Sequence, residues 1–368
     1  MKNNIVPPIQ SGQIKYLNNI RIIALFLVLF AHLVTVPSVT PTMQEYFSNG
    51  FILPVLPSAI KYIGFDLFLQ RFLHTACGPI GVVLFILLSG YLATISRHKY
   101  TNQEFITKRI IRLWPGLFLS LTFVTLLVMF VGGVKISGWQ YFFNIFLLQP
   151  IVGYPPITGV VWVLIIEMLY YLIMTFVKKI NIRSISIINL FVMFLLFFEI
   201  TSGNTSLQLL NSYVRFIPLM LFGSAIQIYG LKNIRTILLG LWSYAIIVAS
   251  QKLIFTNFYF YTSSFTYTIP LLIWVCSYYG TKYIKTPKLL RFGFLDKLKS
   301  VIINTSYIVY LIHVTLGIYC LYYLRNILPT GLNIITSVFL VFVISYIIHR
   351  FMEKPISNYL TKKFIKKS

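Results

Sequence analysis

Apolar residues form long runs along the chain, and short polar segments separate them. Ten of these runs are candidates to cross a bilayer, for which a helix needs roughly 17–25 mostly apolar residues. They lie at about 20–37, 79–95, 110–133, 159–177, 185–201, 214–229, 236–253, 267–280, 301–321 and 333–349. The pattern predicts an all-α integral membrane protein, a bundle of about ten transmembrane helices.

Basic residues gather at every second connection between the runs. With the N-terminus placed in the cytoplasm, 25 of the 31 Lys and Arg residues fall on the cytoplasmic side. Because cytoplasmic loops of membrane proteins are enriched in Lys and Arg, this asymmetry predicts that both termini are cytoplasmic. The expected organisation is an N-terminal segment at 1–19, a transmembrane domain at 20–350 and a basic cytoplasmic tail at 351–368.

Composition limits the range of functions. Hydrophobic residues make up 58% of the 368 residues, the mean hydropathy is +0.82 and only 10% of residues are charged. Ten spans of ~20 residues and their loops would leave no length for a soluble catalytic domain of ~100 residues. The net charge of +24 lies in the connecting segments, so the expected partner is the lipid bilayer and not nucleic acid. The three cysteines lack metal or redox spacing, and no metal site is predicted.

Three ionisable residues lie well inside apolar runs, away from their ends: Glu167, His32 and His313. A carboxylate at the centre of a bilayer costs about 2.5–3.5 kcal/mol on insertion scales, and such groups commonly mark a pathway or a reaction centre. Glu167 should therefore face the bundle interior, paired with Arg, His or a hydroxyl. His32 could instead be a hydrogen-bonded packing residue, and His313 fits a structural role as well as a reactive one.

Cations at the predicted cytoplasmic ends of two runs are candidates to bind an anionic substrate. Arg21 precedes His32 by eleven residues, about three helical turns, so both side chains share one face. Arg109 and Arg112 are three residues apart beside Lys108, and two guanidinium groups at that spacing suit phosphates. Alternatively, each of these cations only fixes the orientation of its helix in the membrane, as Lys and Arg at cytoplasmic helix ends commonly do.

Six short motifs follow one another along the chain. In order, their residues are Arg21 and His32; Gly81, Val82, Phe85, Ser89, Gly90 and Tyr91; Lys108, Arg109, Arg112 and Pro115; Trp162 and Glu167; Ser306 to His313; and Arg350 to Pro355. In this order, from Asn19 to about Leu360, the chain resembles the acyltransferase family 3 membrane proteins, which O-acylate bacterial surface glycans. Lys108 and Val163 stand where the family pattern has Arg and Ser.

The resemblance implies a membrane O-acyltransferase of the bacterial cytoplasmic (inner) membrane. The expected reaction moves an acyl group, in the first instance acetyl, to a sugar hydroxyl of a surface polysaccharide such as lipopolysaccharide O-antigen or capsule, or of its lipid-linked precursor. The donor would be acetyl-CoA as a substrate, with no bound cofactor.

The resemblance also assigns roles to residues. His32 would be catalytic with Arg21 as its supporting cation, and Arg109, Arg112 and Lys108 would contact the acyl-CoA donor. From their depth, Glu167 and His313 are candidates to orient the imidazole or the acceptor. The residues expected to pack the helices are Ser89, Gly90, Tyr91, Trp162, Tyr310 and Glu353.

Alternatives remain at two levels. Within the transferase interpretation, His32 either removes a proton from the attacking hydroxyl or becomes transiently acylated. Beyond it, intramembrane Glu and His also suit a proton-coupled transporter or a glycan flippase. A membrane partner without catalysis, within a biosynthetic complex, is a third interpretation.

Overall fold

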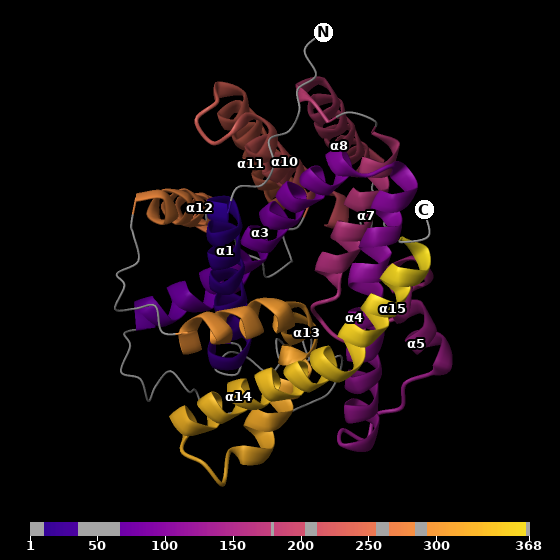
Figure 1. Cartoon of the computed structure of the whole chain (residues 1–368), viewed down its shortest axis with the longest axis vertical. Coiled ribbons are helices and arrows are strands. Elements are labelled where there is room, and N and C mark those ends of the chain that lie inside the picture. Colours follow the sequence, from indigo (N-terminus) through magenta and orange to yellow (C-terminus); the bar gives the residue numbers. More distant parts are fainter. Residues whose placement is uncertain are drawn as a thin grey trace. The chain divides into compact units, whose positions relative to one another are not determined.

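The structure of the chain, a computed structural model, consists of helices. It describes residues 11–35, 67–177, 180–202, 212–254, 265–283 and 293–365, and every regular element in these ranges is helical (Figure 1). The all-α class predicted from the hydrophobic pattern is therefore confirmed.

A helix lies at each of the ten predicted runs. These helices are α1 (Ser11–Phe30), continued by the π-helical turn η1 (Ala31–Thr35), α3 (Leu67–Lys99), α4 (Asn102–Phe130), α7 (Trp162–Phe176), α8 (Ile182–Ser202), α10 (Ile217–Tyr229), α11 (Ile234–Ile254), α12 (Phe265–Tyr283), α13 (Gly293–Leu324) and α14 (Thr330–Ile348). The remaining helices are α5 (Gly138–Ile145), α6 (Gln149–Val152), a second π-helical turn η5 (His349–Glu353) and α15 (Lys354–Phe364).

Several helices have the length and composition of membrane spans. Among the described residues, five stretches qualify, namely Lys15–Val34, Cys77–Lys99, Asn102–Phe130, Asp296–Leu324 and Thr330–Phe364. Shorter apolar helices occupy Trp162–Phe176, Ile182–Phe198 and Ile234–Ser250. The chain is thus a multi-pass membrane protein, while the number of ten spans and the cytoplasmic position of both termini stay predictions.

The surface of α8 agrees with a lipid environment. Large apolar side chains along this helix are exposed, among them Ile187, Leu190, Phe191, Phe194 and Phe197. An exposed apolar stripe of this kind is unusual on a soluble monomer, whereas lipid tails would cover it without loss.

The chain divides into two compact units, which are described separately. Unit 1 comprises Met1–Arg21, Val82–Thr107 and Trp162–Lys285, and unit 2 comprises Ile22–Gly81, Lys108–Val161 and Thr286–Ser368. Helices α1, α3 and α4 therefore contribute residues to both units.

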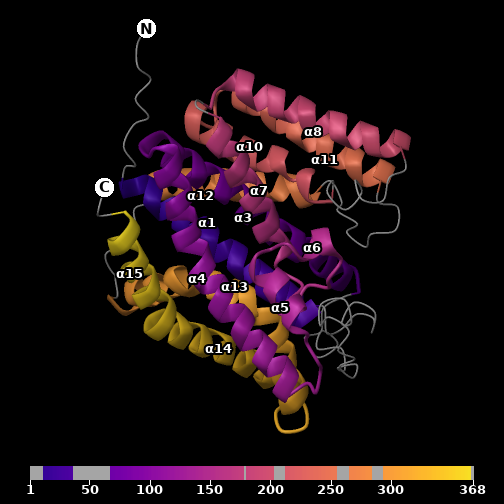
Figure 2. The ribbon, with the colours of Figure 1, turned by 90° about the vertical axis from the view of Figure 1, so that its right-hand side faces the viewer.

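Unit 1 is organised around α10. Residues 217–226 are all buried, and the helix packs against α7, α8 and α11 (Figure 2). It also approaches α3 closely, because a Cβ atom at Gly90 would collide with the backbone carbonyl of Met220, and one at Gly223 with that of Leu87. Small residues are the usual means by which membrane helices come this close.

Unit 2 is organised around α13. Residues 308–319 are buried without interruption, and the helix packs against α14 and against η1. A Cβ atom at Gly317 would collide with the side chain of Leu33 in η1. The middle of α13 therefore lies against the turn that carries His32.

Candidate active site

His32 lies in the π-helical turn η1, directly after α1. A π turn closes its hydrogen bonds over one more residue than an α turn, and isolated π turns inside helices occur frequently at functional sites. The side chain of His32 is only 9% exposed, and its neighbours Ala31 and Leu33 are buried. The imidazole is thus held within the protein interior.

His32 contacts the second intramembrane histidine, His313 of α13. The Nδ1 atom of His32 is 2.8 Å from the Nε2 atom of His313, and the ring centroids are 5.0 Å apart. His313 is completely buried. The fold therefore joins two of the residues selected from the sequence, although 281 positions separate them.

The hydrogen bonds of His313 determine which of its ring nitrogens carries the proton. Its Nδ1 atom is 2.7 Å from the carbonyl oxygen of Tyr310 and 3.2 Å from that of Val309. Because a carbonyl oxygen only accepts, Nδ1 is the donor, and Nε2 of the neutral ring is then an acceptor. His32 accordingly donates from Nδ1, and its lone pair resides on Nε2, the atom that a base or nucleophile uses.

Tyr310 connects this pair to the chain segment before α7. Its hydroxyl donates to the carbonyl oxygen of Val160 at 3.2 Å, and its ring centroid is 5.8 Å from that of His313. The backbone carbonyl of the same residue receives the His313 proton. Hydrogen bonds in such a buried setting are electrostatically stronger than in water, so Tyr310 helps to hold the imidazoles in place.

The two arginines predicted to bind the donor differ in exposure. Arg109 is 5% exposed, whereas Arg112 lies open on the surface of α4 and Lys108 is partly buried. The two guanidinium groups therefore differ in their access to a ligand at the protein surface. Arg21 belongs to unit 1 and is partly buried, and the roles of all four cations stay predictions.

Two hydrogen bonds fix the part of α4 that carries these cations. The Tyr307 hydroxyl donates to the carbonyl oxygen of Leu113 at 2.9 Å, and the Ser357 hydroxyl to that of Ile111 at 3.4 Å. Helices α13 and α15 therefore both attach to this part of α4.

A second histidine contact, which the sequence interpretation missed, occurs in η5. The Nδ1 atom of His349 lies 2.5 Å from Oε2 of Glu353, and both side chains are mostly buried. Glu353 also lies close to α4, because a Cβ atom added at Gly116 would be 3.6 Å from its Oε1 atom. The four-residue spacing of His349 and Glu353 could have revealed the pair, because side chains at that spacing meet on a helix.

Glu167 of α7 is hydrogen-bonded in unit 1, where the hydroxyl of Ser89 on α3 donates to its Oε1 atom. Ser89 was predicted only to pack, and so has an additional polar role. Trp162 packs against Phe216 with ring centroids 5.4 Å apart. Within the described residues, no three His, Cys, Asp or Glu side chains gather as metal ligands would. The catalytic role of Glu167 stays a prediction.

Comparison with known proteins defines the class. The acyltransferase 3 family, described as an acyltransferase domain, matches residues 14–350, and the chain therefore belongs to this family. Nodulation protein 10 of Rhizobium leguminosarum bv. viciae is 28% identical over 113 residues, which cover 25% of this chain and 31% of that protein. The match spans about a third of the length of that relative. No solved structure matches the chain. The family match and the apolar helices together make the chain a multi-pass membrane member of the acyltransferase 3 family.

Proposed function

We propose that the protein transfers an acetyl group from cytoplasmic acetyl-CoA to a sugar hydroxyl of a cell-surface polysaccharide or of its lipid-linked precursor, in the bacterial cytoplasmic membrane. The buried contact between His32 and His313 is the observation that carries this proposal. In this contact Nδ1 of His32 carries the proton and donates to His313, so Nε2 of His32 is the basic atom.

In the general-base route, Nε2 of His32 removes the proton from the sugar hydroxyl as that oxygen attacks the thioester carbonyl. The new carbon–oxygen bond forms, the carbon–sulfur bond breaks, and the imidazolium returns its proton to the CoA thiolate. His313 accepts the Nδ1 hydrogen bond of His32 throughout and stabilises the intermediate positive charge, as the carboxylate does in a catalytic triad.

In the covalent route, the same Nε2 atom attacks the thioester, the carbon–sulfur bond breaks, and CoA leaves as its thiolate. The sugar oxygen then attacks the acyl carbon and the carbon–nitrogen bond breaks. The hydroxyl proton passes to Nε2 and on to the thiolate, which regenerates neutral His32. Both routes need the same tautomer of His32, so the hydrogen bond that His313 accepts from His32 supports either.

The donor is proposed to reach His32 from the cytoplasm, with the CoA phosphates bound by Arg109, Arg112 and Lys108 and with Arg21 as a further cation. Guanidinium groups bind phosphate through paired, charge-assisted hydrogen bonds. The predicted topology places all four cations at the cytoplasmic ends of their helices, where CoA is available.

The test uses a strain that lacks the gene, complemented with wild type, His32→Ala or His98→Ala. His98 is an exposed histidine at the end of α3 and serves as the matched control. Proton NMR of extracted surface glycans should show acetyl signals with wild type and His98→Ala, and none with His32→Ala at equal membrane expression.

Two results would contradict the proposal. Acetyl signals restored by His32→Ala would make His32 structural and the mechanism wrong. Glycans whose acyl content never changes, even on deletion of the gene, would favour a transporter or flippase.

A further inference from the structure

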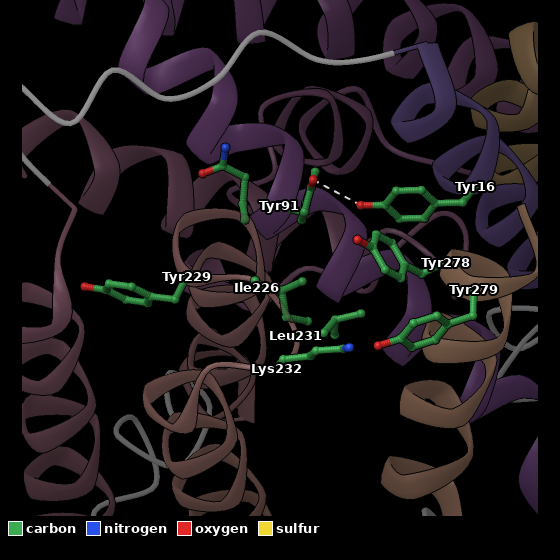
Figure 3. Close-up of a pocket in the computed structure, with 10 residues that line it drawn as sticks. Tyr16, Tyr91, Ile226, Tyr229, Leu231, Lys232, Tyr278 and Tyr279 are labelled. Carbon is green, nitrogen blue, oxygen red and sulfur yellow. Dashed lines mark hydrogen bonds between the residues drawn. The ribbon is translucent and has the colours of Figure 1, made fainter. Parts of the chain in front are cut away.

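Unit 1 contains a cavity of about 300 Å³, a volume at the lower end of small-molecule sites. Its walls come from α1, α3, α12 and from the end of α10 with the turn that follows (Figure 3). None of its lining residues belongs to the histidine pair, so the proposed chemistry does not account for it.

Tyrosine rings that pack edge to face form one side of the cavity. Tyr278 packs edge-on against Tyr16, with centroids 5.4 Å apart, and edge-on against Tyr279, with centroids 5.2 Å apart. The Tyr16 hydroxyl donates to that of Tyr91 at 3.0 Å (Figure 3). These contacts restrict the rings, so the cavity offers a preformed aromatic surface.

Among the described residues, two polar groups at the cavity lack a protein partner of matching chemistry. The Oε1 atom of Gln227 is buried and accepts no hydrogen bond from the described residues, which is a costly state for an amide oxygen. Lys232 is exposed, its Nζ atom lies 5.7 Å from the Tyr279 ring centroid, and it forms no ion pair within the described ranges. The cavity thus provides one acceptor and one cation.

The predicted topology opens this cavity to the cytoplasm. Tyr16 precedes the first predicted run at 20–37, and Lys232 lies in a predicted cytoplasmic connection. Tyr91 and Tyr278 lie near the cytoplasmic ends of the predicted runs that contain them. Four separate segments therefore agree on the side of the membrane from which a ligand would enter.

We propose that this cavity binds a nucleoside phosphate whose base carries an amino group. The base would stack on the tyrosine rings, as nucleobases commonly do on aromatic side chains. Its amino group would donate to Oε1 of Gln227, and its phosphate would bind Lys232. The nucleotide is either the adenosine 3′-phosphate part of the CoA donor or a free cytoplasmic nucleotide. In the first case the inference rests on the proposed function and leaves only the diphosphate of CoA to Arg109, Arg112 and Lys108.

The test measures binding of adenosine 3′,5′-bisphosphate to the purified full-length protein in nanodiscs by titration calorimetry. Lys232→Gln and Gln227→Leu should each weaken binding about tenfold, the effect of one lost hydrogen bond to a charged or buried group. Lys15→Gln is the matched control, because Lys15 is exposed on the same predicted side but does not line the cavity. It should leave the affinity within about twofold of wild type.

Competition identifies the source of the nucleotide. Displacement of adenosine 3′,5′-bisphosphate by acetyl-CoA would support the proposal with the donor as ligand. Binding of ATP that depends on Lys232 and Gln227 and that resists acetyl-CoA would support it with a free nucleotide.

The proposal is overturned if wild type of normal thermal stability binds no nucleotide, or if Lys232→Gln behaves as Lys15→Gln does. It is also overturned if inorganic phosphate or phosphatidylglycerol, at a concentration similar to that of the nucleotide, abolishes nucleotide binding, since the site would then recognise only an anion. Binding is expected to persist in His32→Ala. Nucleotide binding by the wild type, together with glycans whose acyl content does not change on deletion of the gene, would contradict the proposed function and leave the cavity assignment intact.

Discussion

A pair of neutral imidazoles joined by one hydrogen bond has two possible proton arrangements, and the backbone of α13 selects one of them. The carbonyl groups of Val309 and Tyr310 accept from Nδ1 of His313, which leaves its Nε2 atom to accept from His32. The position of the proton on His32, the proposed base, thus depends on α13, whose residues 308–319 are buried.

Substitutions of His313 should distinguish a positioning role from simple packing. His313→Leu removes the acceptor, and we expect acyl transfer to fall by roughly 10²–10⁴-fold. His313→Gln offers an amide oxygen near the position of Nε2 and should recover about a tenth or more of the activity. The measurement is acetyl-CoA-dependent transfer in membranes at equal protein level. Equal losses in the two variants would show that acceptor chemistry at this position is irrelevant.

Glu167 allows a similar separation of charge from structure. Glu167→Gln keeps an oxygen that can accept from Ser89 but removes the negative charge. If Glu167 orients the imidazole or the acceptor, this variant should lose at least about tenfold in transfer rate while its apparent melting temperature stays near that of wild type. Ser89→Ala, which leaves the carboxylate without its hydroxyl donor, should instead lower the melting temperature. Unchanged activity in Glu167→Gln would make the residue structural.

The residues of the site were predictable from sequence more readily than their contacts. His32, Glu167 and His313 are conspicuous because each interrupts an apolar run. Which of them touch is not encoded in their spacing, because helix pairing decides it. His349 lies at the end of the predicted run 333–349, where a polar residue is common, so its position alone does not distinguish it.

At the scale of elements, the hydrophobic runs predicted where helices lie but not where each one begins. Helix α3 starts at Leu67 and includes Pro79, whereas the run was predicted to begin at position 79. Proline weakens soluble helices, but neighbouring groups in membrane proteins compensate for the lost hydrogen bond. The π turns were not predicted either, because one additional residue hardly changes the periodicity of a uniformly apolar run.

The close approach of α3 and α10 predicts a strong effect of a single methyl group. Gly90→Ala places a Cβ atom against the backbone carbonyl of Met220, which cannot move aside as a flexible side chain could. We expect destabilisation of about 1–3 kcal/mol or more, seen as a lower apparent melting temperature of the purified protein. Gly138→Ala is the control, because nothing lies within 4 Å of the new atom. Equal melting temperatures of the two variants would refute the tight contact.

At the scale of the whole molecule, the orientation in the membrane is open to a direct measurement. In a variant without Cys77, Cys276 and Cys320, single cysteines at the exposed positions Lys135 and Lys299 should lie on opposite sides. A membrane-impermeant maleimide should label Lys135→Cys in intact spheroplasts and Lys299→Cys only after permeabilisation. The opposite labelling pattern would invert the charge-based topology.

Composition and charge sufficed to predict an all-α membrane protein, but not its division into two units or the tyrosine-lined cavity. Lipid tails are as apolar as leucine, so the choice of helix partners depends on shape and on small residues such as Gly90 and Gly223. The cavity combines residues from four distant segments, and tyrosine is too common in this chain, with 25 copies, to single them out.

The π-helical turn at His32 has a consequence for comparing this chain with its relatives. One extra residue in a helix rotates everything on one side of it by about 100° relative to the other side. A relative in which this turn is purely α-helical would have to align with a one-residue gap between Ala31 and Thr35. An ungapped alignment would match residues that point in different directions, so spacing motifs that cross this turn compare reliably only between proteins that share it.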